Sequence, residues 1–100
     1  MALSEKAAEL MLNTRLAEAE HGVTDAYYDL GVSYSTGSDG VAVDLIEAHK
    51  WFNLAALNGD LRGQAGRADI SYDMTAREIA EAQRQARAWL SCHSTQRYAA

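Results

Sequence analysis

The stretch that decides the fold is residues 23–59, VTDAYYDLGVSYSTGSDGVAVDLIEAHKWFNLAALNG. Each half carries an apolar stripe with the spacing of a helix, and a glycine-rich loop signal separates the two halves. Thr24 is expected to cap the first helix, over about 25–35, and Asp44 is expected to cap the second, which runs to Asn58. The stretch therefore predicts two antiparallel helices joined by a loop.

Helical patterns continue on both sides of this hairpin. Ser4 is a good N-cap for a helix over about 5–20, and Asp60 opens a helix over about 61–72. Thr75-Ala76-Arg77-Glu78 is a capping box that begins a last helix, which runs to about Leu90. The chain has 19 alanines and no proline, a composition that favours helices. We predict an all-α fold of about five helices, arranged as an α/α superhelix, that is, a short solenoid.

Composition and charge exclude several classes of protein. A chain of 100 residues with 48% hydrophobic side chains forms one small domain. Residues 1–60 carry 10 acidic and 3 basic side chains, whereas residues 61–100 carry 4 acidic and 6 basic ones. The net charge of −5 makes nucleic acid an unsuitable partner, because its phosphates would meet like charge. No apolar run reaches the roughly 18 residues of a membrane span, and the N-terminus does not look like a signal peptide, so we expect a cytoplasmic protein with no membrane partner.

One segment is similar to a known repeat family. The positions that carry the similarity are Ala26, Tyr27, Tyr28, Asp29, Leu30, Gly31, Tyr34, Gly37, Gly40, Val41, Asp44, Ala48, Trp51, Phe52, Ala55, Ala56 and Gly59. In this order and spacing they resemble the Sel-one-like repeat, a relative of the tetratricopeptide repeat. The resemblance implies an α/α solenoid that serves as a protein-binding adaptor, with no catalytic residues and no cofactor.

The resemblance also divides the chain. Residues 23–59 form one full repeat, residues 1–22 an N-terminal capping helix, residues 60–92 a divergent C-terminal capping hairpin, and residues 93–100 a tail. Gly22 and Gly59 are 37 residues apart, a period that fits a unit of two helices. Terminal units of a solenoid normally differ from the internal ones, because their outer faces meet water.

Groups that could carry chemistry are few. His21, His49 and His93 are too far apart for a metal pair on one helix, and we place His21 at a helix end and His49 on the surface. Cys92 is the single cysteine, and it precedes His93 in an inert tail because neighbouring residues on a helix do not face each other. The sequence thus predicts no catalytic, cofactor or metal site.

A second face of the helix over about 25–35 is the candidate binding surface. Its residues are Asp25, Tyr27, Tyr28, Asp29 and Val32. They form either a solvated face or an acidic recognition surface with two tyrosines, and the sequence leaves both interpretations open. As a recognition surface, this face would bind a peptide or helix with basic and apolar residues, in the groove formed by the first helices of the hairpins. The alternative function is a small structural or inhibitory homo-oligomer that associates through apolar solenoid ends.

Overall fold

All regular secondary structure in the described part of the chain is helical. The computed structural model describes the backbone of residues 5–98 and the side chains of residues 5–93, so the predicted cap Ser4 lies outside it. Five helices follow one another with short connections: α1 (Glu5–Glu20), α2 (Thr24–Thr36), α3 (Leu45–Leu57), α4 (Leu61–Ser71) and α5 (Ala76–Tyr98). The all-α prediction is therefore confirmed.

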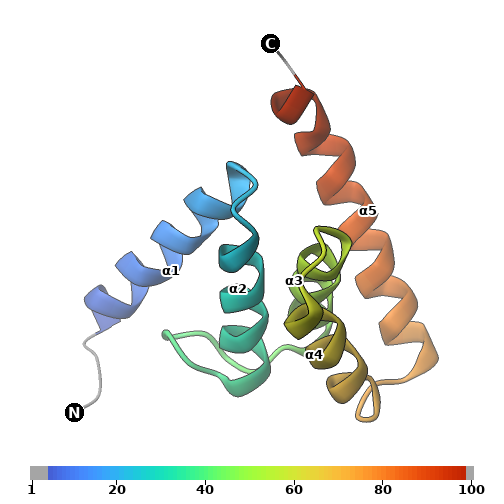
Figure 1. Cartoon of the computed structure of the whole chain (residues 1–100). Helices are drawn as coiled ribbons and strands as arrows, with labels where there is room; N and C mark the ends of the chain where they lie inside the picture. Colours follow the sequence, from blue (N-terminus) through green and yellow to red (C-terminus); the bar gives the residue numbers. More distant parts are fainter. Residues whose placement is uncertain (1–4, 99–100) are drawn as a thin grey trace.

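The helices pack around α3. The central helix, α3, packs against α2, α4 and α5, whereas α1 packs on α2 at one end of the stack. Figure 1 shows α1 and α5 flanking the three middle helices from opposite sides. This arrangement is a short α/α solenoid, in which α2 and α4 are the first helices of successive hairpins.

Most of the helix ends follow the signals in the sequence. The Asp44 carboxylate accepts a hydrogen bond from the Glu47 amide at 3.1 Å, and the Asp60 carboxylate accepts one from the Arg62 amide at 2.9 Å. Both bonds of the capping box are present, because the Glu78 amide donates to the Thr75 hydroxyl and the Thr75 amide donates to the Glu78 carboxylate.

Two predicted helix ends are wrong. Thr24 is the first residue of α2 rather than its cap, and Val23 occupies the N-cap position. The side-chain amide nitrogen of Asn58, Nδ2, lies 3.4 Å from the Thr24 hydroxyl. This contact joins the start of α2 to the end of α3. The last helix continues to Tyr98, well beyond Leu90, because no glycine or proline interrupts its sequence.

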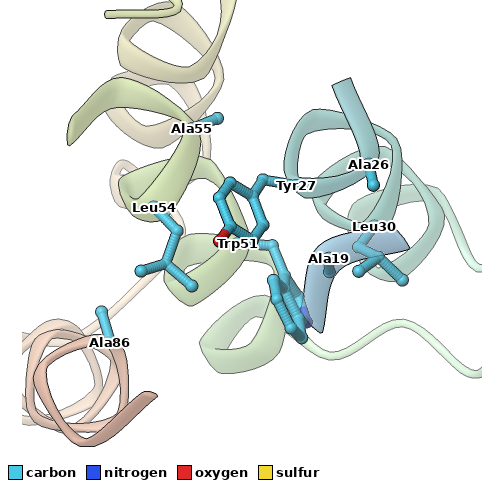
Figure 2. Close-up of a cluster of buried hydrophobic side chains, with 8 residues drawn as sticks. All are labelled: Ala19, Ala26, Tyr27, Leu30, Trp51, Leu54, Ala55 and Ala86. Carbon is cyan, nitrogen blue, oxygen red and sulfur yellow. The ribbon is translucent and has the colours of Figure 1, made fainter. Parts of the chain in front are cut away.

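The core is built around Trp51 of α3. The Trp51 ring stacks on Tyr27 with 6.0 Å between centroids, and Trp89 of α5 meets it edge-on at 4.8 Å. Figure 2 shows Trp51 between side chains of α2 on one side and of α3 and α5 on the other. Trp51 and Phe52 are both buried.

Three glycines allow Phe52 of α3 to fit between α2 and α4. A Cβ atom on Gly31 would lie 2.4 Å from Phe52 Cδ1, and one on Gly66 would lie 2.9 Å from Phe52 Cζ. A Cβ atom on Gly63 would lie 2.7 Å from the Phe52 carbonyl oxygen. Gly63 and Gly66 lower the helix propensity of α4, but they let α4 approach α3 closely.

A polar contact joins α1 to the loop after α2. Arg15 of α1 donates to the carboxylate of Asp39, which also accepts the hydroxyl of the buried Ser33 at 2.5 Å. The Asp39 backbone has a φ of 58°, in the left-handed region that aspartate tolerates better than most residues. The loop thereby holds α1 against the repeat.

His49 is buried, and its predicted place on the surface is wrong. The side chain is only 2% exposed, because α4 covers this side of α3. Burial, assisted by the positive charge of Arg67, lowers the pKa of His49 below its usual value. His49 is therefore neutral in the folded protein at neutral pH.

We expect His49 to make the protein less stable in mild acid. Below about pH 6.5 the unfolded chain takes up a proton on this imidazole while the folded chain resists it, so stability falls as the pH falls. One such group changes stability by at most about 1.4 kcal/mol per pH unit. Urea unfolding at two pH values, about 7.5 and about 5.5, should show the loss in the parent and a smaller loss in His49→Gln. His21→Gln is the control, because His21 is exposed, and it should keep the parent's pH dependence.

Candidate partner-binding groove

A groove runs between α2 and α4. Its volume is about 540 Å³. The lining comes from α2, from α4 and from one residue of α3, namely Tyr28, Val32, Ser35, Thr36, Phe52, Arg62, Ala65, Gly66, Asp69 and Ile70. The groove is thus the surface between the first helices of the two hairpins.

The floor of the groove is apolar. The Phe52 ring lies beneath Gly66, and Tyr28 lies beside it with 5.7 Å between ring centroids. Val32 and Ile70 add aliphatic carbon from the two walls. A partner's apolar side chain would bury its surface against these groups at a gain of roughly 25 cal/mol per Å².

One end of the groove carries a cluster of charges around Arg62. The Arg62 Nη2 atom donates to Asp25 and to Asp60, each at 2.8 Å, and its Nε atom donates to Asp60 at 3.1 Å. The guanidinium also lies over the Tyr28 ring, 4.3 Å from its centroid. The hydrogen bonds that Arg62 donates to Asp60 lower the pKa of Asp60, and those that it donates to Asp60 and Asp25 raise the pKa of Arg62. These contacts hold Arg62 in place at the rim.

The groove as a whole is negative. Arg62 is outnumbered by Asp25, Asp60 and the exposed Asp69, which leaves a formal charge of −2. Arg62 already engages two carboxylates, whereas Asp69, farther along the same helix, is exposed at the groove. The surface favours a cationic group in whatever occupies it.

The comparison with known families agrees with this geometry. Residues 24–60 match the model of the Sel1 repeat. The chain contains a Sel1 repeat. The match agrees with the predicted repeat boundaries to within one residue at each end, and α2 and α3 are the two helices of the repeat. No curated protein and no solved structure gave a significant match to the chain.

The Sel1 repeat is a protein-interaction repeat, and the described residues agree with a binding module. Among residues 5–93, no group of three or more histidine, cysteine, aspartate or glutamate side chains could hold a metal ion. Within the described part of the chain, no helix is long and apolar enough to cross a membrane.

The structure separates the five candidate binding residues of the Sel1 repeat. Tyr28 and Val32 line the groove, and Asp25 stands at its rim with 81% of its side chain exposed. Asp29 lies outside the groove lining, and its carbonyl accepts the Ser33 hydroxyl at 3.0 Å. The proposed role of Tyr27 is wrong, because its ring is only 2% exposed and packs on Trp51, where no partner can reach it.

The sequence analysis placed the groove between the first helices of the hairpins but named no residue of the α4 wall. The signal that could have found it is the 37-residue period, which relates Asp25 to Arg62 and Val32 to Asp69. These paired positions face each other across the groove because α4 repeats the place of α2 in the next hairpin. Gly63 and Gly66 weaken the helical pattern of α4, which makes the similarity between α4 and α2 harder to see in the sequence.

Proposed function

We propose that this chain is a non-catalytic adaptor that binds a segment of a partner protein in the groove between α2 and α4. The observation that carries the proposal is an apolar floor, open to solvent, beneath a rim with a formal charge of −2. A peptide or helix that presents an apolar side chain next to a lysine or arginine complements this surface.

The dimensions of the walls limit the partner segment. The helix α2 has 13 residues and therefore spans about 20 Å, at roughly 1.5 Å per residue. A partner helix of three to four turns, or an extended segment of about six residues, would match that length. The apolar side chain would rest on Phe52 between Val32 and Ile70, and the cationic one would pair with Asp69.

Tyr28 contacts both the apolar floor and the charged rim of the groove. Its ring packs beside Phe52 on one side and beneath the Arg62 guanidinium on another. A rigid aromatic ring held in this way loses little entropy when a partner covers it. We therefore expect Tyr28 to contribute more binding energy than any other side chain of the α2 wall.

A charge reversal on the α4 wall tests the proposal. The partner is first captured from the source cell with the intact chain as bait, and its affinity is then measured with the parent and with variants. Asp69→Lys should weaken binding about tenfold, mainly by slowing association, and should flatten the dependence on salt. Tyr28→Ala should accelerate dissociation.

Asp73→Lys is the matched control for the charge reversal. Asp73 is also exposed and lies just after α4, but it is not part of the groove lining. This variant should bind as the parent does, and both aspartate variants should keep the parent's melting temperature, because exposed charges usually change stability by less than about 0.5 kcal/mol. Equal affinities for Asp69→Lys and the parent at low salt would show that the partner docks elsewhere.

A further inference from the structure

The two ends of the solenoid carry opposite charge. The first end is α1, where Glu5, Glu9, Glu18 and Glu20 are exposed and Lys6 is the exposed base. The other base of α1, Arg15, is half-buried and engaged with Asp39. The α1 end is thus negative.

The α1 end also has a shallow apolar hollow. Its volume is about 300 Å³, and its lining residues are Leu10, Met11, Thr14, Arg15 and Glu18. Leu10 is 63% exposed and the adjoining Met11 is 37% exposed. The hollow therefore places exposed aliphatic carbon next to the Glu18 carboxylate.

The opposite end of the solenoid is the outer face of α5. Arg77, Arg84 and Arg87 are exposed there, together with Ala80 and Ser91, at spacings of three and four residues that form one helical stripe. The Arg84 guanidinium donates a hydrogen bond to the Glu81 carboxylate at 2.7 Å. Arg77 and Arg87 are the exposed cations on either side of Arg84. This exposed stripe of α5 is cationic rather than apolar, with small residues between the arginines.

We propose that a second copy of this chain docks its α5 arginine stripe on the α1 hollow. An arginine side chain can lay its methylene groups on Leu10 and Met11 while its guanidinium pairs with Glu18. The small side chain of Ala80 allows the two helices to approach. The charges of the two faces are complementary, and the complement of each face is present on the same molecule.

The geometry makes this association head-to-tail. Figure 1 shows α1 and α5 on opposite sides of the stack, so the two faces cannot meet within one chain. A contact between unlike faces leaves one free face of each kind at the ends of every assembly, and further copies can add. The association is weak and sensitive to salt, because its charged groups are exposed.

Light scattering coupled to size exclusion tests the proposal with the intact chain alone. The parent at high concentration and low salt (about 0.02 M) should show a mass above the 10.9 kDa of one chain, and about 0.5 M salt should return it to that mass. The charge change Asp73→Lys, away from both faces, should leave this behaviour unchanged. A parent that stays at the mass of one chain under all these conditions overturns the proposal.

Two complementary variants make the test specific for the two faces. Thr14→Arg with Glu18→Arg makes the α1 hollow positive, so that both docking faces are positive, and Arg77→Glu with Arg87→Glu makes both docking faces negative. Each double variant alone should stay at the mass of one chain and keep the parent's helical circular dichroism. An equimolar mixture of the two should associate again. Association of either variant alone as strongly as the parent, or a mixture that remains monomeric, would refute a contact between α1 and α5.

Discussion

Replacement of Gly31 by leucine should destabilise the fold substantially. A Cβ atom alone would lie 2.4 Å from the Phe52 ring, far inside contact distance, and the rest of the leucine must displace that ring from between α2 and α4. Overpacking of this kind costs about 1–3 kcal/mol or more. Thermal and urea unfolding should show the loss as a lower melting temperature and midpoint.

A matched control and a second-site change separate this clash from general effects of leucine. Ala68→Leu adds the same side chain at an exposed position of α4, and it should change stability by no more than about 0.5 kcal/mol. Phe52→Leu should cost less in the Gly31→Leu background than in the parent, because the smaller residue makes room. An unchanged melting temperature for Gly31→Leu would show that the position is not in contact with Phe52.

Removal of residues 75–100 should abolish cooperative unfolding altogether. This deletion takes away α5, and with it Trp89 and Ala86, which cover Trp51 and Leu54. Trp51 alone represents about 2–3 kcal/mol of burial, a large part of the stability of a domain of this size. The shortened chain should aggregate or unfold without a sharp transition, as measured by light scattering and circular dichroism.

A shorter deletion tests whether the effect comes from the packed part of α5. Removal of residues 94–100 leaves Trp89 and its stacked neighbour His93, whose ring centroids are 3.7 Å apart. This variant should melt within a few degrees of the parent, because a change under about 0.5 kcal/mol shifts the melting temperature of so small a domain only slightly. A soluble, sharply melting product of the long deletion would show that α1 to α4 form a sufficient core.

Much of the fold could be predicted because its signals are local. The cap at Asp44, the capping box at Thr75 and the left-handed Gly37 after α2 each depend on residues within one turn of the chain. The prediction failed at Thr24 for a related reason. A threonine before a helical stretch can cap it or begin it, and the contact that fixes its place comes from Asn58, far away in the sequence.

The two neighbouring tyrosines show what local pattern could not resolve in the binding site. Both tyrosines border the acidic face of α2, although Tyr27 also lies three residues before Leu30 and seven before Tyr34, at the edge of the apolar stripe. They are about 100° apart around the helix, which turns Tyr27 towards Trp51 and leaves Tyr28 in the groove. The difference arises from where α3 and α4 lie, and no property of either tyrosine encodes it.

The sequence by itself determined the five helices, their order and the repeat over residues 24–60, because helix periodicity and caps depend on neighbouring residues and the 37-residue period can be read directly along the chain. Only the tertiary structure decided which faces remain open. The burial of His49, the place of Arg62 beside Asp25 and the floor formed by Phe52 all depend on the approach of α4 to α2 and α3. The helices approach closely because small residues of α2 and α4 pack against the Phe52 ring. Packing of this kind depends on contacts between residues that are distant in the chain.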